Sequence, residues 1–366
     1  MCNISFLGCK PVYTKNGYII TPIAKDPSDA EITRTMDAAE DFSKYVNSGI
    51  HASVYSLGKD LVVKKYQCTT RAQDEISALD NMYDNDIKSS GIQSGMYAFT
   101  TPKGVCYLVS KKISGEPIKR VKFNKENLSC IVDALLQLDK PRLENNKYGV
   151  YINYDMHDEN ILASENSAGI IDYEYLKFIS LDESMSVFNK GRHDIRTSDI
   201  PGCSSNLRTF EIGILYRYLN RDYISKSERE ILFYIYLLLK SEYHQKMSDY
   251  LQNEYERSKN EYLKELAIKH KAHAQMLKNP DKNVINAEYL KMEIGNTLSE
   301  YAGISHELAN KAYYFVSLQY LMAQNSIQNI YWADCKKYIE SACKMTYSDI
   351  IEKISSEIKK NKNPKY

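Results

Sequence analysis

The chain has 366 residues, of which 43% are hydrophobic and 26% are charged, and its formal net charge is +1. This length can bury the core of a two-lobed domain with a further helical region, and the small net charge gives no basic footprint for nucleic acid. The eight cysteines form no CxxC pair, which favours reduced thiols over a disulfide framework or a zinc site.

No segment of the sequence is typical of membrane insertion or Sec-dependent export. The longest apolar run, Ile231 to Leu239, is too short to span a bilayer and predicts a buried helix. No charged-then-apolar pattern predicts a Sec signal peptide. We therefore expect no membrane span.

The first 27 residues show no hydrophobic period and contain three prolines, which predicts an irregular leader. From Ser28 to Tyr45 the pattern is helical, with Ser28 or Asp29 as the expected cap. The apolar stripe of this helix consists of Ile32, Met36, Ala39 and Phe42.

A turn, a strand and a helix are expected next. Asn47 to Tyr55 is rich in small residues, and Leu61 to Lys65 predicts a strand whose alternation places Lys64 and Lys65 on opposite faces. Residues 71–83 have helical periodicity, and Glu75 lies one position before the apolar Ile76 of its buried face.

Two strands, Met96–Thr100 and Val105–Val109, follow with a hairpin turn at Pro102–Gly104. After an exit turn from Ser110 to Pro117, Asn124 to Leu138 predicts an amphipathic helix.

Three polar residues in the middle of the chain suggest the chemistry. Asp155, Asn160 and Asp172 occur in this order within twenty residues, in a pattern of loop, strand, turn and strand that ends at Asp172. Phosphoryl transfer needs an acid to orient the acceptor hydroxyl and oxygen ligands for Mg²⁺. A transition-metal site at His157, beside Asp155 and Asp158, is the alternative, but no second His or Cys cluster accompanies it.

This stretch resembles the catalytic loop and metal motif of the protein-kinase-like superfamily. Its Asp-x-His-x-x-Asn-Ile-Leu form is most similar to aminoglycoside and choline/ethanolamine kinases, and Asp172-Tyr-Glu-Tyr resembles the choline/ethanolamine form of the metal motif. Upstream, Asn47–Tyr55 resembles a degenerate glycine-rich loop, and the exit turn resembles the hinge of aminoglycoside-type kinases.

The resemblance implies an enzyme that uses ATP and Mg²⁺. Asp155 would be the catalytic acid-base residue, and Asn160 and Asp172 would ligate the metal. Lys64 would hold the α- and β-phosphates and would be fixed by Glu75, with Asp74 as the fallback.

The nucleotide site implied by the same resemblance combines the phosphate loop with the hinge. Gly49, Ala52 and Val54 would belong to the loop. The adenine would meet backbone groups from Ser110 to Lys112, with Tyr107 or Leu108 at the back of the pocket.

The expected fold is α+β, a two-lobed protein-kinase-like fold with an additional C-terminal helical region. Its expected divisions are a leader (1–27), an N-lobe (28–112), a C-lobe (113–240) and a helical extension (241–366). Within the extension we expect a long helix over 241–276, ended by Asn279–Asp281, and further helices near 286–300, 305–324 and 331–360. A capping box at Ser227–Glu230 would open the helix that precedes them.

The sequence departs from the family pattern at three positions. Asn153 stands where the family usually has His, Glu174 replaces the glycine of Asp-Phe-Gly, and Arg208 replaces the aspartate of the central C-lobe helix. These differences indicate an atypical member.

The resemblance leaves the acceptor open. The first hypothesis is a protein Ser/Thr kinase, because the degenerate loop and added helices resemble bacterial type III secreted effector kinases. Such a kinase would act on a host protein after export from the bacterial cytoplasm without a Sec signal. An activating partner would then be expected at the C-terminal helices. The alternatives are a small-molecule kinase, similar to aminoglycoside or choline kinases, and a kinase-fold scaffold or nucleotidyl transferase.

Overall fold

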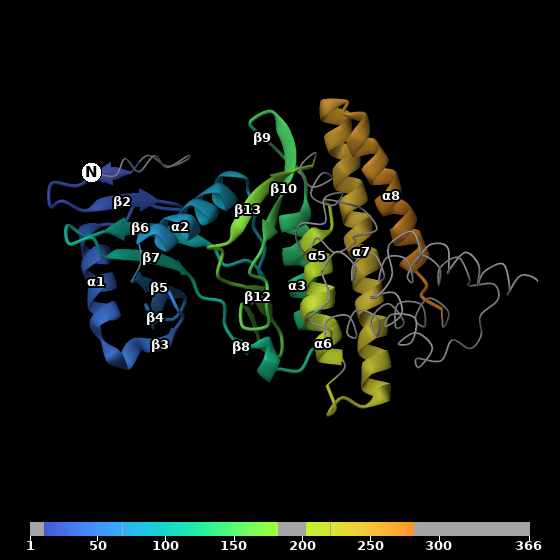
Figure 1. Cartoon of the computed structure of the whole chain (residues 1–366), viewed down its shortest axis with the longest axis horizontal. Coiled ribbons are helices and arrows are strands. Elements are labelled where there is room, and N and C mark those ends of the chain that lie inside the picture. The colour runs from blue at the N-terminus through green and yellow to red at the C-terminus, as the bar shows by residue number, and fades with distance from the viewer. Residues whose placement is uncertain (1–10, 68, 182–202, 220, 282–366) are drawn as a thin grey trace, which may run out of the picture. The chain divides into compact units, whose positions relative to one another are not determined.

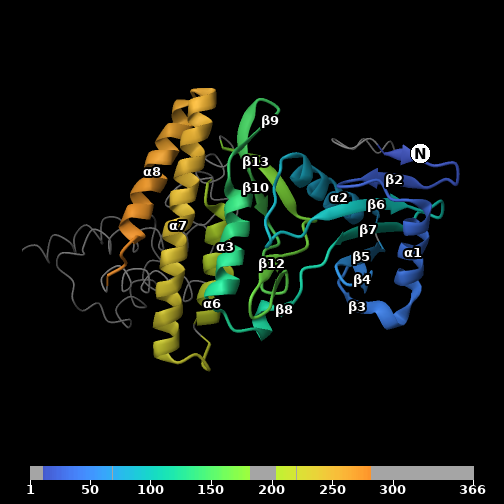
Figure 2. The same ribbon diagram turned by 180° about the vertical axis from the view of Figure 1, so that it is seen from behind.

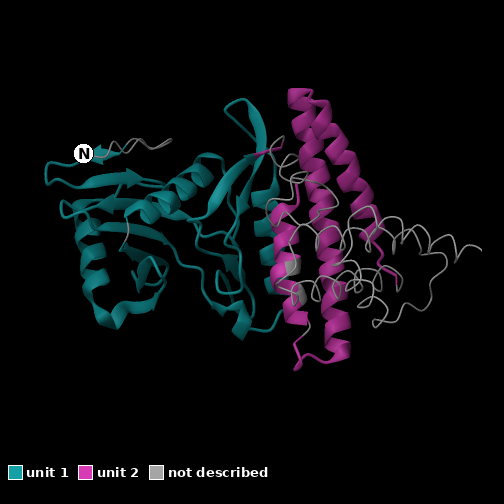
Figure 3. Cartoon of the chain, viewed as in Figure 1, with its two compact units in different colours: residues 1–179 teal, residues 180–366 magenta. Residues whose placement is uncertain are grey.

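The computed structural model describes residues 11–67, 69–181, 203–219 and 221–281 (Figure 1). The chain divides into two compact units, residues 1–179 and residues 180–366 (Figure 3). Each unit is described by itself. The mixture of an antiparallel sheet with helices confirms the α+β class.

Unit 1 begins with a seven-stranded antiparallel sheet of order β1-β2-β6-β7-β5-β4-β3. Its central strand pair joins Lys64 of β5 to Leu108 of β7. The strands are β1 (Val12–Tyr13), β2 (Ile19–Pro22), β3 (Tyr45–Ser48), β4 (Ala52–Ser56), β5 (Leu61–Tyr66), β6 (Gly95–Thr100) and β7 (Cys106–Lys111).

The expectation of an irregular leader is wrong for the part of it that the structure describes. Strand β1 pairs with β2, and β2 continues the sheet by pairing with β6. The turn between them closes where the Gly17 N–H donates to the Thr14 carbonyl, and Gly17 has a φ of 79°. Two strands of two and four residues are too short for a hydrophobic period to reveal them.

Two helices cover opposite faces of this sheet (Figures 1 and 2). Helix α1 (Asp29–Glu40) packs on the face of Val63 and Val109, where these side chains form one buried core. Helix α2 (Thr69–Asp84) packs against β5, β6 and β7 and reaches the face that carries Lys64. The alternation expected for β5 is therefore what separates the apolar core from the polar site.

Helix α1 starts at the expected residue but ends earlier than expected. Ser28 forms a capping box with Glu31, whose N–H donates to Ser28 Oγ at 3.3 Å. The helix stops at Glu40 because Asp41 is extended and its side chain accepts the Ser43 N–H. Phe42 lies in the following 3₁₀ turn, Phe42–Lys44, and is 83% exposed rather than buried.

The rest of unit 1 carries the central polar residues. Helix α3 (Lys125–Asp139) confirms the helix expected over Asn124–Leu138, with Asn124 as its cap. Two three-stranded sheets, of order β13-β10-β9 and β12-β11-β8, complete this part of the unit. Their strands, with a 3₁₀ turn at Ile118–Arg120 after β8, are β8 (Glu116–Pro117), β9 (Arg142–Glu144), β10 (Lys147–Asn153), β11 (Ile161–Ala163), β12 (Ala168–Ile170) and β13 (Leu176–Ser180).

Unit 2 is helical in the part that the structure describes. It contains α5 (Ser205–Phe210), a π-helical turn (Glu211–Leu215), α6 (Tyr216–Leu219), α7 (Lys226–Ser258) and α8 (Glu261–Leu277). The helices expected near 286–300, 305–324 and 331–360 lie outside the described residues. No helix in the described ranges has the length and apolar character needed to cross a membrane.

The helix boundaries in unit 2 differ from the expected ones. Helix α7 passes through residue 240 without a break, and it ends where Lys259 adopts a left-handed φ of 55°. Its capping box is Ser225 with Glu228, two positions before the expected one. The division of the chain at 27, 112 and 240 stays a prediction.

Arg208 belongs to a buried charge network inside unit 2. Glu211 accepts hydrogen bonds from Arg208 at 3.1 Å and from Tyr236 at 2.5 Å, and it forms an ion pair with Lys240 at 2.7 Å. These side chains connect α5 and the π-helical turn to α7. The arginine that departs from the family pattern therefore has a packing role among the helices of this unit.

Helices α7 and α8 also enclose a histidine pair. His244 and His270 are 3% and 0% exposed, and their Nδ1 atoms lie 2.8 Å apart. Burial, with repulsion from His273, lowers the pKa of His270 to about 3. Burial, with repulsion from His270, Lys240 and His273, lowers the pKa of His244 well below its usual value. Both imidazoles are thus neutral in the folded chain at neutral pH.

This pair makes the stability of unit 2 depend on pH. In the unfolded chain both histidines take up protons below about pH 6.5, so the unfolded state binds more protons than the folded state in acid. The free energy of unfolding then falls as the pH drops below about 6.5, by up to about 1.4 kcal/mol per pH unit for each histidine, and is insensitive to this pair above it. Urea unfolding followed by helical circular dichroism at pH 7.5, 6.5 and 5.5 measures the effect.

The variant His244→Leu/His270→Leu should lose this dependence on pH. His157→Gln is the control, since its side chain is 45% exposed and should leave the wild-type dependence intact. A wild-type free energy of unfolding that stays constant from pH 7.5 to 5.5 would contradict the assignment of two neutral buried histidines.

Candidate active site

The site in unit 1 is built on a lysine and a glutamate from two elements. Lys64 on β5 and Glu75 on α2 are 8% and 1% exposed. The Lys64 Nζ donates to both carboxylate oxygens of Glu75, at 2.7 and 2.8 Å. Asp74, the fallback partner, lies instead 3.6 Å from the Arg71 guanidinium. The structure thus pairs Lys64 with Glu75, as expected.

Asp172 supplies a second carboxylate to the same ammonium group. Its Oδ1 lies 3.5 Å from the Lys64 Nζ. Burial alone would lower the pKa of Lys64, but the attraction of Glu75 and Asp172 outweighs it and raises that pKa above its usual value. Lys64 therefore stays cationic, which is the state needed to bind phosphate oxygens.

The backbone of Asp172 is held in an uncommon conformation. Its φ is 65°, in the left-handed region that non-glycine residues seldom adopt. Asn153 contributes to holding it, since the Asn153 Nδ2 donates to the Asp172 carbonyl at 3.5 Å. Strain of this kind, about 1–3 kcal/mol, is concentrated at functional sites.

The loop that carries Asp155 and Asn160 is tied together by hydrogen bonds. The Asn160 Nδ2 donates to the backbone oxygen of Asp155 at 2.9 Å and to its Oδ2 at 3.0 Å. Asn153 Oδ1 accepts the Asp155 N–H at 3.0 Å, and the Asn160 carbonyl accepts the Ile171 N–H at 2.9 Å. The structure therefore brings Asp155 and Asn160 together, and Asn153 links this loop to Asp172.

The donor set suits Mg²⁺ better than a transition metal. Asn160 and Asp172 offer an amide and a carboxylate oxygen, and Mg²⁺ is bound in proteins by few such ligands together with substrate phosphates. The Asp172 side chain is 34% exposed, so its oxygens are accessible. The His157 Nδ1 accepts the Glu159 N–H instead. Among the described residues no group of three His, Cys, Asp or Glu side chains is arranged to hold a metal.

The turn between β3 and β4 is the candidate phosphate loop. The Gly49 N–H donates to the Ala52 carbonyl at 2.9 Å, which closes the turn. Val54 pairs with Lys64 and Ala52 pairs with Tyr66, so both loop residues share the sheet face of the lysine.

His51, which the sequence analysis did not single out, links this turn to the metal motif. Its Nε2 lies 3.8 Å from Glu174 Oε1. Burial, and then repulsion from Asp172, raises the pKa of Glu174 above its usual value. In the sequence, the only sign of this contact was Glu174, two residues after Asp172. No pattern identified His51 as its neighbour.

The hinge differs in detail from the expectation. Tyr107 lies opposite Lys65 and stacks on Phe99 at 5.0 Å in the core beneath α1, so it is on the wrong face of β7 to line a pocket with Lys64. Leu108, opposite Lys64, is on the right face. A one-residue step along a strand reverses the side-chain direction, which explains the difference.

Ser110 and Lys112 are also placed. Ser110 is 1% exposed and, two positions after Leu108, shares its face; its Oγ makes no hydrogen bond within the part of the chain that the structure describes. The Lys112 N–H donates to the Asp60 carbonyl at 2.8 Å. This amide is therefore already used inside the protein and is not free to meet an adenine ring.

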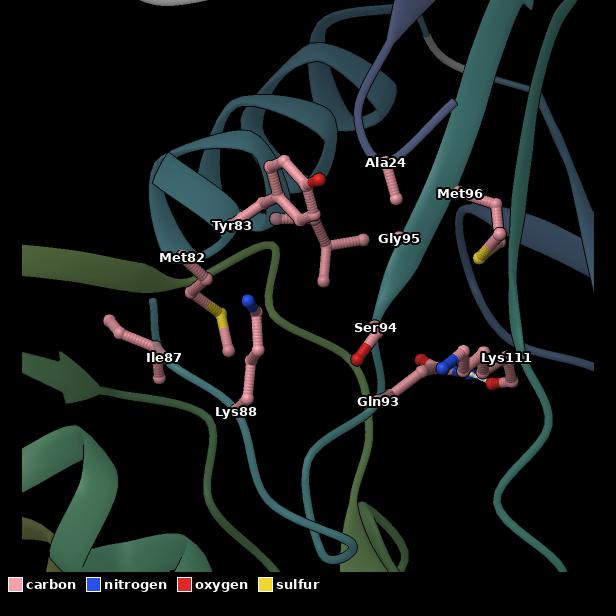
Figure 4. A pocket seen from close by; sticks show the side chains of 11 residues that line it. Ala24, Met82, Tyr83, Ile87, Lys88, Gln93, Ser94, Gly95, Met96 and Lys111 are labelled. Carbon is pink, nitrogen blue, oxygen red and sulfur yellow. Dashed lines mark hydrogen bonds between the residues drawn. The ribbon is translucent and has the colours of Figure 1, made fainter. Parts of the chain in front are cut away.

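A hollow of about 150 Å³ lies between α2 and the start of β6, lined by side chains that include Leu79, Met82 and Tyr83 of the helix (Figure 4). None of the predicted catalytic, metal-binding or phosphate-loop residues lines it. Lys111, which belongs to the expected hinge Ser110–Lys112, does line it, so the hollow adjoins the hinge and not the Lys64–Glu75 pair.

A buried lysine on a central strand, its helix glutamate, and a loop that carries Asp155 and Asn160 before Asp172 are arranged as the resemblance to the protein-kinase-like superfamily predicts. No family model and no curated protein matches the chain.

Solved structures with some likeness include the ADP-bound aminoglycoside phosphotransferase APH(2'')-Ib, with 12% identity and a TM-score of 0.33 over 69% of this chain and 99% of that one. The streptomycin–ATP complex of APH(2'')-IIa has 12% identity and a TM-score of 0.31 over 59% and 90% of the two chains. The CAK complex of Chaetomium thermophilum bound to ATP-γ-S has 16% identity and a TM-score of 0.28 over 43% and 52%. These likenesses are low and carry no argument about the site.

The turn gives a test that separates nucleotide binding from stability. A methyl group on Gly49 would meet only the Ala52 carbonyl, at 4.0 Å, so Gly49→Ala should change the free energy of unfolding by no more than about 0.5 kcal/mol. If the turn's backbone approaches phosphates, the same methyl group should raise the dissociation constant for ATP several-fold. Calorimetric titration with ATP and thermal unfolding measure the two quantities.

Gly58→Ala is the matched control in the neighbouring turn of the same sheet. Gly58 has a φ of 83° with nothing within 4 Å of the added methyl, so the substitution should cost about 1 kcal/mol of stability without affecting ATP binding. Unchanged ATP affinity in Gly49→Ala would argue against this turn as the phosphate loop.

Proposed function

We propose that the chain is an ATP- and Mg²⁺-dependent phosphotransferase. The observation that carries this proposal is the placement of the Lys64 ammonium between the carboxylates of Glu75 and Asp172. The ammonium of a buried lysine that is held by carboxylates is already shielded from water. It can therefore bind the α- and β-phosphates of a nucleotide without first losing a hydration shell.

The remaining residues take the roles that phosphoryl transfer needs. Asn160 and Asp172 hold Mg²⁺, which when bound neutralises charge on the phosphate oxygens. Asp155 orients the acceptor hydroxyl and takes its proton as the acceptor oxygen bonds to the γ-phosphorus. The bond from that phosphorus to the β–γ bridging oxygen breaks, and ADP leaves. Asn160, bonded to Asp155 Oδ2, keeps this carboxylate oriented.

For the acceptor we propose a Ser or Thr hydroxyl of a protein. The Asp155 side chain is 39% exposed and its neighbour Tyr154 is 40% exposed. This exposure of the loop within unit 1 supports an acceptor as large as a polypeptide. Action on a host protein, after export without a Sec signal, is the part of the proposal that depends only on the likeness to effector kinases.

A small-molecule acceptor is the second candidate, favoured by a different observation. The Asp155-Met-His-Asp-Glu-Asn160 loop and the Asp172-Tyr-Glu-Tyr175 motif resemble those of aminoglycoside and choline/ethanolamine kinases. The exposed Asp155 suits a hydroxyl on a small cation as well as one on a protein.

The assignment of Asp155 predicts a large loss of turnover on substitution. Asp155→Asn should lower kcat by about 10²- to 10⁴-fold, because the acceptor proton then has no base to receive it. Its thermal unfolding should match the wild type, since an amide keeps the size of the side chain. Asp158→Asn, in the same loop and without a predicted role, is the control and should keep its turnover. A kcat for Asp155→Asn equal to that of the wild type would contradict the proposal.

The two acceptor classes are separated by following the label from ATP. Purified protein is incubated with γ-labelled ATP and either a cell lysate or a panel of aminoalcohols and aminoglycosides. We expect label in protein bands, at serine or threonine, and none with Asp155→Asn. Label found only in small molecules would instead support the second candidate. Transfer of label from α-labelled ATP would identify a nucleotidyl transferase.

A further inference from the structure

The Glu75 carboxylate has more partners than the lysine with which it pairs. Tyr66, at the end of β5, donates its hydroxyl to Glu75 Oε2. The backbone N–H of Tyr173 approaches Glu75 Oε1 at 3.5 Å. Both oxygens of Glu75 therefore accept a hydrogen bond in addition to those from the Lys64 ammonium.

Tyr66 occupies a position that the sheet fixes. It lies two residues after Lys64, so both side chains leave the same face of β5. Its backbone sits between Ala52 of β4 and Cys106 of β7, and the residue is 6% exposed. The donor to Glu75 thus comes from the middle of the sheet rather than from a segment that has to move.

The hydroxyl of Tyr66 is a permanent donor. Burial, and then the charge of Glu75, raises the pKa of Tyr66 well above its usual value. A hydrogen bond from a hydroxyl to a charged carboxylate is stronger than one between neutral groups. Without this hydrogen bond, the Oε2 atom of Glu75 would be held less firmly against Lys64.

Tyr173 adds an anchor from the metal motif. It follows Asp172 directly, it is fully buried, and its own hydroxyl donates to the Ile170 carbonyl at 2.8 Å. The N–H that approaches Glu75 is thereby held at a fixed place relative to Asp172. Helix α2, strand β5 and the metal motif converge on one carboxylate.

We propose that Tyr66 is a positioning residue, whose hydroxyl, with the Tyr173 amide, holds Glu75 against Lys64 before any nucleotide binds. This inference rests on the phosphotransferase proposed above. It adds that the Lys64–Glu75 pair forms in the isolated chain without an activating partner. A partner at the C-terminal helices would then have to act on some other step.

Tyr66→Phe tests the proposal because it removes the hydroxyl and keeps the ring. We expect the KM for ATP, and the dissociation constant for ATP measured by calorimetry, to rise about five- to tenfold. The kcat should change less than threefold, since the catalytic loop is untouched. Amide hydrogen exchange in α2, measured on the full chain without nucleotide, should become faster.

Tyr97→Phe is the matched control. Tyr97 is also a buried tyrosine of this sheet, but its hydroxyl bonds to Thr35 on the α1 face at 3.1 Å. This variant should lose a comparable amount of thermal stability and bind ATP like the wild type. If Tyr66→Phe behaves in the same way, Tyr66 is merely structural and the proposal fails.

A measurement on the wild type covers the case in which Tyr66→Phe does not fold. In the purified chain without nucleotide, the α2 amides around Glu75 should be protected to within about tenfold of the β5 amides. If the α2 amides exchange faster than the β5 amides by orders of magnitude, the proposal is overturned, because Glu75 is then not held in place before nucleotide binds.

Exchange and calorimetry also separate this inference from the proposed function. Absence of phosphoryl transfer by the wild type, with α2 protected, would contradict the phosphotransferase and leave the anchoring of Glu75 standing. A second outcome would contradict only the role of Tyr66. In that outcome Asp155→Asn abolishes phosphoryl transfer, but Tyr66→Phe has the same KM for ATP as the wild type.

Discussion

The buried ammonium of Lys64 is the constraint on which the arrangement of unit 1 depends. A lysine of this burial is stable only beside carboxylates, and it has two, Glu75 at 2.7 Å and Asp172 at 3.5 Å. These carboxylates come from a helix and from the segment after β12, so one cation fixes the sheet, α2 and the metal motif together. Loss of one partner from such a buried set costs about 3–5 kcal/mol, because it leaves a charge uncompensated. The same charge is what a nucleotide would use.

The sequence predicted strands and helices well where the type of residue and the hydrophobic period indicated the same element. The apolar run before Lys64 and the helical stripe beside Glu75 predicted β5 and α2, and the order of Asp155, Asn160 and Asp172 predicted a shared site. Tyr66 was overlooked because a tyrosine at the end of an apolar strand looks like packing. Only the register of β5 and the placement of α2 show that its hydroxyl meets Glu75.

The errors have equally local causes. Tyr107 and Leu108 are adjacent and both apolar, so the sequence could not say which one shares a face with Lys64; the pairing of β5 with β7 decides it. The helix expected over 241–276 is instead divided between α7 and α8, because α7 ends at Lys259, a residue type that rarely marks a left-handed cap. Two serines, Ser225 and Ser227, each precede a glutamate by three residues, and either could have started that helix.

The short strands β1 and β2 have a consequence for the surface of the sheet. Strand β2 pairs with β6 through Ile19–Pro22, and so covers amide and carbonyl groups that β6 would otherwise present to solvent. An uncovered strand edge of this kind recruits strands from other molecules and leads to aggregation. A protein shortened to begin after Pro22 would retain Lys64, Glu75, Asp155 and Asp172, but its solubility would suffer. Strands β1 and β2 therefore protect the edge of β6 from self-association, a role that differs from that of the residues around Lys64.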